Sequence, residues 1–411
     1  MTTSGPDDWG SGGRTAGDPL WSTPGEAAAP AYEQAELADG GTRPSQVPLS
    51  GGPERGLDDT QRSGPILPER PPVRQQPVAT ARHAQSATDE RLPGVERAAR
   101  AAGAVRAAIG RAVYGQNEVL DHVLAGFLAG GHVLLEGVPG LGKTLLVLAL
   151  ARAVGGKFSR IQFTPDLMPA DVTGHAIYDQ SAGQFRIRKG PVFANLLLGD
   201  EINRAPAKTQ AALLEVMQEQ QVTIEGEAFP LAPPFMTLAT QNPIEQEGTY
   251  PLPEAQVDRF LLKIRMQYPE EREEVTIVQG VTQGRIGQSL DVSQVQPVLT
   301  PEQAVLLQHQ VAHVTVDQRI VEYAVRIVRA TRTRQGVAVG AGPRGAIALV
   351  RVGRAVALLA GRDFVTPDDI KSIALPALRH RLSVAPELEI EGLRADDVLR
   401  SILDTVEAPR Q

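Results

Sequence analysis

The sequence contains no cysteine, which excludes disulfide bonds, thiolate metal sites and cysteine nucleophiles. The segment Met1–Gly10 is polar and acidic without an apolar centre, so we expect no secretory signal there. No run approaches the roughly 18 uninterrupted apolar residues of a membrane helix, since Arg351 and Arg354 interrupt the apolar stretch 350–359. These absences predict a soluble, cytoplasmic protein with no membrane span.

Positive charge is also scarce. The chain has 41 Lys and Arg against 48 Asp and Glu, a formal net charge of −7. Binding to a nucleic-acid duplex requires Lys and Arg concentrated on one face to neutralise phosphates. The composition therefore predicts no nucleic-acid partner.

A length of 411 residues allows two or three domains. Residues 1–90 are rich in Gly, Pro, Ser, Gln and Asp, which predicts a disordered tail, although Trp9 and Trp21 leave a docking arm open. In residues 91–295, strand patterns alternate with helix patterns, which predicts an α/β core with a mostly parallel sheet. Residues 296–411 predict an all-helical domain. Strands are expected at 132–136, 158–163, 192–198, 235–239 and 261–266.

The most informative motif is Gly137–Thr144, which matches G-x-x-x-x-G-K-[ST]. Its glycines allow backbone N–H groups to approach phosphates, Lys143 adds a charge for the β- and γ-phosphates, and the Thr144 hydroxyl can bind Mg²⁺. The motif lies between the strand 132–136 and an apolar helix at 144–151. A plain Gly-rich turn is the alternative, but it leaves Lys143 and the strand–loop–helix setting unexplained.

A second apolar strand ends in Asp200 and Glu201. In a parallel sheet this end faces the same crevice as the phosphate loop. Asp200 would hold Mg²⁺ through water, and Glu201 would orient and deprotonate the attacking water. A solvated pair of carboxylates at a strand end is the alternative.

Three further residues give weaker signals. Asn242 ends the strand that begins at Phe235 and could fix the γ-phosphate or the water, but Asn before Pro243 is also a common turn former. Arg259 precedes the last strand, and Arg344 opens a helix of the C-terminal domain. Arginine suits bidentate contact with phosphate. A surface ion pair is the alternative for both arginines.

Two hairpin-like insertions interrupt the alternation, one at 176–178 and 185–188, the other at 222–224 and 228–229. They could decorate the sheet or project toward a substrate or pore.

The ordered set GVPGLGKT, LLLGDEINRA, ATQNP, EAQVDRF and GPRG resembles an AAA+ ATPase. The segments Ile161–Leu167 and Asn242–Pro253 resemble the MoxR family. The resemblance extends over roughly residues 99–403 and does not include the first 90. It implies an AAA+ P-loop core with a helical lid.

The resemblance implies a role for each matching position. Asp200 with Glu201 corresponds to Walker B, Asn242 to sensor 1, Arg259 to the arginine finger and Arg344 to sensor 2. The expected cofactors are ATP and Mg²⁺, with the metal held by Thr144 and Asp200. The residues expected to bind the nucleotide are Gly115 near the adenine and, in the Walker A loop, Gly137, Pro139, Gly140, Gly142, Lys143 and Thr144.

The family resemblance implies a ring, expected to be hexameric, in which Arg259 acts on ATP of the next subunit. It also implies chaperone-like remodelling of a client with a von Willebrand A-domain protein. That partner would be a separate chain, because Gly183 replaces the last Ser of a D-x-S-x-S metal site at 179–183. A magnesium-chelatase-like motor subunit and a nucleotide-gated binding module remain alternatives, and the acidic composition disfavours a nucleic-acid motor. Whether Arg344 acts within its own subunit stays open.

Overall fold

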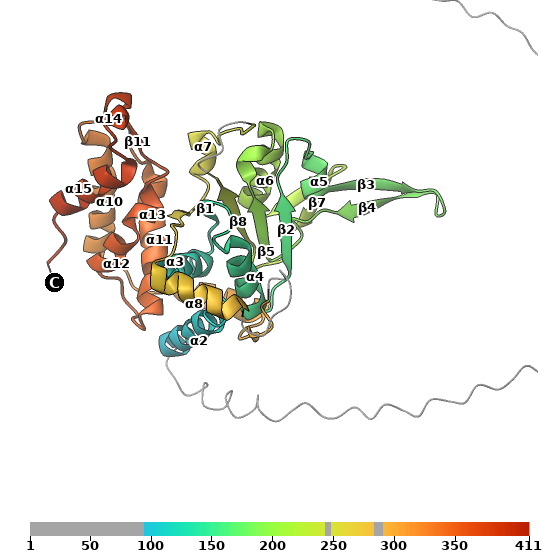
Figure 1. Ribbon diagram of the computed structural model, residues 1–411, viewed down its shortest axis with the longest axis horizontal. Helices are drawn as coiled ribbons and strands as arrows, with labels where there is room; N and C mark the ends of the chain where they lie inside the picture. Colours follow the sequence, from blue (N-terminus) through green and yellow to red (C-terminus); the bar gives the residue numbers. More distant parts are fainter. Residues whose placement is uncertain (1–93, 243–247, 283–290, 411) are drawn as a thin grey trace, which may run out of the picture. The chain divides into compact units, whose positions relative to one another are not determined.

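The computed structural model describes residues 94–242, 248–282 and 291–410, so the tail expected at 1–90 lies outside the described residues (Figure 1). The centre of the described fold is a five-stranded sheet in the order β2-β5-β8-β1-β9, and all of its neighbouring strands run parallel. Its strands are β1 (Val133–Glu136), β2 (Phe158–Gln162), β5 (Leu196–Asp200), β8 (Met236–Gln241) and β9 (Leu262–Arg265). The predicted α/β core with a parallel sheet is confirmed.

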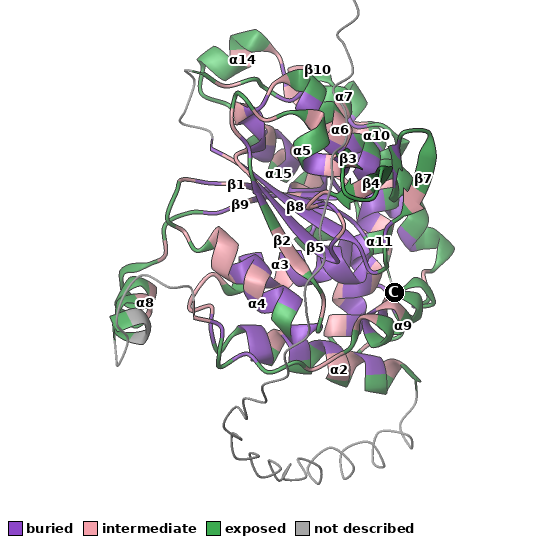
Figure 2. Ribbon diagram, turned by 90° about the vertical axis from the view of Figure 1, so that its right-hand side faces the viewer, coloured by how far each residue is buried: buried purple, intermediate pink, exposed green. Residues whose placement is uncertain are grey.

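Both faces of the sheet are buried, because alternate strand residues point to opposite sides. In β1, Val133 and Leu135 pack into one hydrophobic cluster and Leu134 into another. The first cluster includes residues of α2 (Gly94–Ile109), α3 (Asn117–Leu128) and α4 (Lys143–Ala153), and the second residues of α5 (Pro169–Thr173) and α6 (Ala207–Glu219). The strands β1, β5 and β8 are accordingly mostly purple in Figure 2, whereas the edge strand β2 is only partly buried.

The two predicted hairpins are present. β3 (Gly174–Asp179) pairs with β4 (Gln184–Lys189), and β6 (Gln221–Ile224) pairs with β7 (Glu227–Pro230). The β3–β4 ribbon extends away from the sheet (Figure 1), with the Tyr178 and Phe185 rings in edge contact and exposed. At its turn, Asp179 accepts hydrogen bonds from Ser181 and Ala182. The D-x-S-like sequence thus stabilises a turn here.

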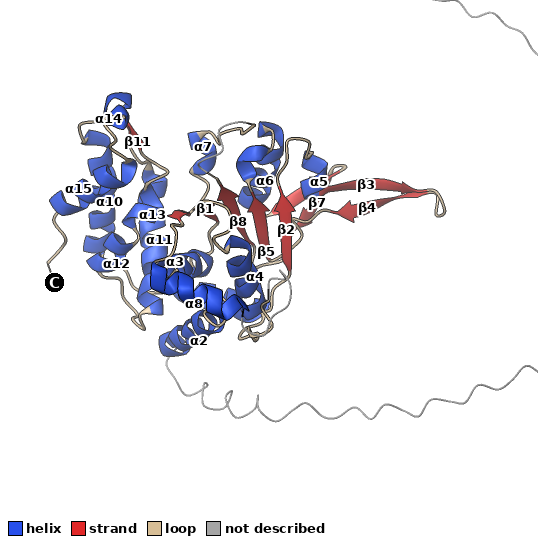
Figure 3. Ribbon diagram, viewed as in Figure 1, coloured by secondary structure: helices blue, strands red, loops and turns tan. Residues whose placement is uncertain are grey.

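The C-terminal lid is helical, as predicted, with one addition (Figure 3). Its helices are α9 (Pro301–Ala312), α10 (Gln318–Thr333), α11 (Pro343–Leu359), α12 (Pro367–Ser372), α13 (Ala374–Leu378), α14 (Pro386–Ile390) and α15 (Ala395–Thr405). The addition is a short antiparallel pair, β10 (Val337–Val339) and β11 (Ser383–Val384), which joins segments far apart in the sequence. Helices of the core and the lid contribute to one continuous hydrophobic cluster, so the two parts share a core.

The largest error among the predicted strand boundaries concerns the strand expected at 192–198, which begins only at Leu196 and continues to Asp200. The other four strands differ from the prediction by one or two residues at their ends. The apolar run before it forms a turn, because the Asn195 side chain accepts a hydrogen bond from the Lys157 amide and donates to the Ala232 and Pro234 carbonyls. The shift places Asp200 as the last residue of the strand. In the described part of the chain, no helix is long and apolar enough to span a membrane.

Candidate nucleotide site

The phosphate loop connects β1 to α4, as predicted. Gly140 and Gly142 adopt φ values of 85° and 80°, a left-handed conformation that side chains with a Cβ rarely adopt. α4 begins at Lys143, and its N-terminus directs unpaired backbone N–H groups toward the loop. The Lys143 ammonium donates to the Gly137 carbonyl, which folds the side chain back over the loop. The loop therefore has the geometry of an anion cradle.

Asp200 ends β5 beside this loop. Its Oδ1 accepts a hydrogen bond from the Thr240 hydroxyl at 2.6 Å, and its Oδ2 accepts one from the Arg160 guanidinium at 2.7 Å. Burial lowers the pKa of Lys143, and the nearby charges of Asp200 and Glu201 oppose that shift. The Lys143 ammonium therefore lies close enough to the Asp200 and Glu201 carboxylates for their charges to affect it.

Glu201 has an unusual backbone, with φ 57° and ψ 50°. Its amide donates to the Thr240 hydroxyl at 2.8 Å, and the 3₁₀ turn Ile202–Arg204 follows directly. Its carboxylate accepts from the Gln162 amide at 2.8 Å and lies 3.3 Å from the Arg204 guanidinium. A residue other than glycine keeps a left-handed backbone conformation only where neighbouring groups hold it there. Here the contact with Thr240 holds the Glu201 backbone, and the chain leaves the strand at this residue.

The donor set fits Mg²⁺. Mg²⁺ keeps several waters and is typically held by one or two carboxylates together with substrate phosphates. Asp200 and the Thr144 hydroxyl at the start of α4 supply that set, and the described residues contain no larger cluster of His, Asp or Glu that would form an all-protein metal cage. These two residues would hold the ion, as expected from the sequence.

Asn242 follows the last residue of β8 and is buried. Gln241 pairs with Glu136, the residue before the phosphate loop, so Asn242 lies at the same edge of the sheet. The structure therefore places Asn242 with Lys143 and Asp200, although the sequence signal alone was weak.

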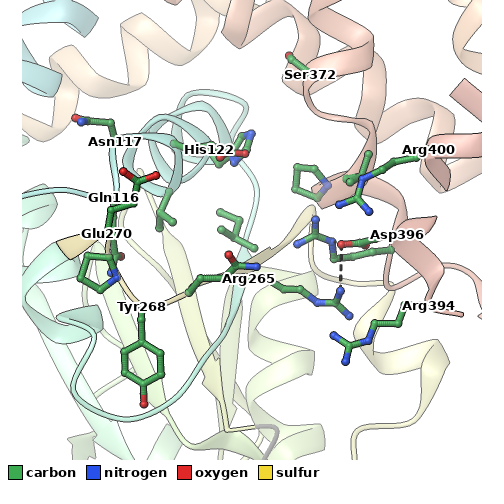
Figure 4. A pocket seen from close by; sticks show the side chains of 18 of the residues that line it. Gln116, Asn117, His122, Arg265, Tyr268, Glu270, Ser372, Arg394, Asp396 and Arg400 are labelled. Atoms are coloured by element: carbon green, nitrogen blue, oxygen red, sulfur yellow. Dashed lines mark hydrogen bonds and ion pairs between the residues drawn. The ribbon is translucent and has the colours of Figure 1, made fainter. Parts of the chain in front are cut away.

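Gly115 and Gln116 form a left-handed turn before α3, with φ values of 67° and 52°. The Gln116 amide donates to the Leu141 carbonyl of the phosphate loop at 3.5 Å. Gln116 also lines a cavity of about 830 Å³ that lies between the core and the lid, with Tyr268 on its wall (Figure 4). The expected base-binding segment is thus attached to the phosphate loop.

Arg259 and Arg344 lie elsewhere. They line a separate hollow of about 380 Å³, next to the residues that precede β9. β9 and β1 start in register, with Leu262 beside Val133, and the phosphate loop follows the other end of β1. The two arginines are therefore one strand length away from the loop, on the order of 10 Å or more. The predicted site residues form two groups at opposite ends of the sheet.

Asp258 organises the second group. Its carboxylate accepts from the Arg381 Nε at 2.7 Å and from Arg344 at 3.4 Å. Arg259 donates to the Leu214 carbonyl of α6 at 3.1 Å. Arg381 is almost fully buried, whereas Arg344 is 56% exposed, so the site presents a solvent-facing cation on a rigid support.

Sequence reasoning missed a charged network beside the phosphate loop. Glu136 accepts from Lys263 at 2.6 Å and from Arg265 at 3.0 Å. Arg265 also contacts Asp396 of the lid at 3.0 Å, and Arg379 contacts the other oxygen of Asp396 at 3.1 Å. A carboxylate directly before the loop was the available signal, but its partners come from distant segments.

Comparisons with known proteins agree with this architecture. Residues 132–262 match the family model described as ATPase family associated with various cellular activities (AAA), and residues 329–402 match the AAA lid domain. The class is therefore an AAA+ P-loop ATPase with its lid.

The relatives narrow the class. The chain is 48% identical to the uncharacterized protein YeaC of Bacillus subtilis, over 74% of this chain and 93% of that protein. It is 46% identical to chaperone MoxR1 of Mycobacterium tuberculosis, over 73% and 80% of the two chains. The crystal structure of an ATPase candidate from Cytophaga hutchinsonii matches with a TM-score of 0.71 and 41% identity, over 80% of this chain and 99% of that one. The chain belongs to the MoxR family of AAA+ ATPases.

Proposed function

We propose that this protein binds and hydrolyses Mg-ATP in a ring oligomer and uses the cycle to remodel or mature a partner complex. The observation that carries the proposal is the division of the site residues. Lys143, Asp200, Glu201 and Asn242 gather at one end of the sheet, whereas Arg259 and Arg344 lie at the other.

The first group has the residues for hydrolysis. The loop amides and Lys143 would bind the phosphates, and Thr144 with Asp200 would hold Mg²⁺. The ion would neutralise charge on the phosphate oxygens. Glu201 would orient water and take its proton, and Asn242 would contact the γ-phosphate or that water. In this chain the Glu201 carboxylate accepts from the Gln162 amide and also lies 3.3 Å from the Arg204 guanidinium, so it would exchange these contacts for the attacking water.

The second group has the chemistry of a phosphate clamp but faces away from its own loop. An arginine supplied by a neighbour can contribute about 10³- to 10⁵-fold in rate. Arg259 and Arg344 are adjacent on one surface, which supports a role for both in the site of the next subunit. We therefore propose that Arg344 acts on the nucleotide of the neighbouring subunit.

Mixing two inactive variants tests the divided site. Lys143→Ala removes the nucleotide half and keeps the arginines, and Arg259→Ala does the reverse. We expect each variant alone to show little Mg-ATPase activity and the mixture to recover part of it, because some interfaces pair an intact loop with an intact arginine. Co-assembled rings without recovered activity would contradict the divided site.

The remodelling step needs a separate test. Glu201→Gln should bind nucleotide and hydrolyse it slowly, so it should retain a partner during purification from the native host. Mass spectrometry should then identify a von Willebrand A-domain protein and a client. A variant recovered alone, with ATP bound, would argue instead for a nucleotide-gated module without a stable partner.

A further inference from the structure

If Arg344 acts in the neighbouring subunit, any lid cation that contacts the subunit's own nucleotide must come from another part of the lid. A cavity of about 820 Å³ has Gly137 and Val138 of the phosphate loop on one wall. The lid segment 392–395, which includes Arg394, lines the same cavity. This lid segment, not the start of α11, therefore faces the subunit's own loop.

The lid segment is fixed to the core at that place. Asp396, two residues after Arg394, is 11% exposed and contacts Arg265, an ion pair dashed in Figure 4. Arg265 in turn contacts Glu136, the residue before Gly137. Partly buried ion pairs with shared partners hold their geometry better than isolated surface pairs. The start of α15 is thereby linked to the start of the phosphate loop through a single arginine.

Three arginines line this cavity, and their partners differ. Arg265 and Arg379 are both engaged with Asp396. The Arg394 guanidinium is exposed and has no ion pair within residues 94–242, 248–282 and 291–410, while its backbone amide donates to Asp397 at 3.1 Å. Arg394 is thus held through its backbone amide, and its guanidinium is available to bind an anion.

We propose that Arg394 contacts the phosphates of the nucleotide bound in its own subunit. The proposal rests on the proposed function, because it assumes ATP in the Gly137–Thr144 loop. An arginine fork binds phosphate oxygens with two charge-assisted hydrogen bonds. Arg394 and Arg344 then have complementary roles. Arg394 contacts the subunit's own nucleotide, and Arg344 contacts the nucleotide of the neighbouring subunit.

Nucleotide affinity tests this assignment without turnover. The full-length Glu201→Gln chain serves as the parent, and calorimetry with Mg-ATP and Mg-ADP is done at concentrations where the chain is unassembled. We expect Arg394→Gln to raise the Kd for Mg-ATP about tenfold, the effect of losing one charge-assisted contact. The Kd of Arg394→Lys should lie between those of the parent and of Arg394→Gln, because lysine keeps the positive charge but cannot form the bidentate contact.

Arg326→Gln is the matched control. Arg326 is an exposed arginine of the lid helix α10 that donates to the Glu407 carbonyl at 3.1 Å and lines neither of the two cavities. Its replacement should leave both affinities unchanged. Thermal unfolding without nucleotide checks that each variant is folded.

The outcomes distinguish a failure of this assignment from a failure of the proposed function. A parent that binds Mg-ATP and an Arg394→Gln variant with the same Kd would overturn the assignment alone. A parent that binds neither nucleotide would overturn the proposed function and this assignment with it. If Arg394→Gln does not fold, Arg394→Lys decides, because a lysine with unchanged affinity overturns the bidentate contact.

Discussion

The Thr240 hydroxyl donates to Asp200 Oδ1 at 2.6 Å and accepts from the backbone amide of the next residue, Glu201. One buried hydroxyl on β8 thus fixes both acidic residues at the end of β5. Asp200 is held through its side chain and Glu201 through its backbone, in a left-handed conformation. The neighbouring strand β8 therefore determines the orientation of the Asp200 carboxylate and the backbone conformation of Glu201.

Thr240→Val should therefore impair catalysis more than nucleotide binding. The variant keeps the shape and leaves an amide and a carboxylate oxygen unpaired, which costs about 1–3 kcal/mol of stability. We expect kcat to fall by about tenfold or more, because Asp200 and Glu201 both lose the contact that orients them, and each 1.4 kcal/mol of lost transition-state stabilisation lowers the rate about tenfold. Steady-state Mg-ATPase assays at increasing Mg²⁺ measure the effect.

Thr237→Val is the matched control on the same strand. Thr237 is also fully buried, and its hydroxyl has no hydrogen-bond partner among the described residues. Its replacement should be neutral or stabilising and should leave kcat unchanged. Equal losses in both variants would show that the Thr240 effect is only a loss of packing.

Glu201→Gln tests the general base directly. The amide keeps the size and most hydrogen bonds of the side chain but cannot accept a proton. We expect ATP hydrolysis to fall by about 10²- to 10⁴-fold with little change in Kd for ATP. Single-turnover hydrolysis and calorimetry measure the two quantities. Unchanged hydrolysis would assign the proton transfer to another group.

The contact between core and lid at Asp396 predicts a stability difference between neighbouring aspartates. Asp396→Asn leaves Arg265 and Arg379 without their shared counter-charge in a mostly buried place, and we expect a loss of about 2 kcal/mol. Asp397→Asn disrupts an exposed pair with Arg400, so its cost should stay below about 1 kcal/mol. Urea unfolding at neutral pH compares the two, and equal losses would remove the special role of Asp396.

A buried histidine predicts a dependence of stability on pH. His132 accepts from the Thr237 amide and contacts the Met217 carbonyl, and burial lowers its pKa from 6.5 to about 4. The unfolded chain therefore binds a proton at a higher pH than the folded chain does. The contribution is complete above pH 6.5 and is lost as the pH falls toward 4, by about 1.4 kcal/mol per pH unit.

Urea unfolding at about pH 7 and pH 5 measures this slope. Burial lowers the pKa of His380 as well, so its loss adds to that of His132. His132→Gln should be less stable at pH 7 but should have a shallower slope, whereas replacing the exposed His309 should not change it. An unchanged slope in His132→Gln would mean that other groups cause the acid destabilisation.

Much of the site could be predicted from the sequence because it lies in contiguous motifs. Residues 137–144 carry their own strand, turn and helix signals, and Asp200–Glu201 end an apolar strand. The start of β5 at Leu196 could not be predicted. The side-chain amide of Asn195, the residue before it, donates hydrogen bonds to the Ala232 and Pro234 carbonyls, which are distant in the sequence. Apolar periodicity does not report such distant partners.

The sequence by itself determined the chemical inventory: a phosphate loop, two carboxylates, an asparagine and two arginines in a set order. The tertiary structure decided which of them meet. Parallel strands bring Lys143, Asp200 and Asn242 to one edge. The β1–β9 register places Arg259 at the other, and the contact with Asp258 places Arg344 beside it. The tertiary structure also decided that Arg394 lines the same cavity as Gly137, because the contact between Arg265 and Asp396, 131 positions apart, holds the start of α15 against the core. The spacing of residues in a sequence reflects local backbone geometry. The distances between the site residues depend instead on the packing of segments that are far apart in the sequence.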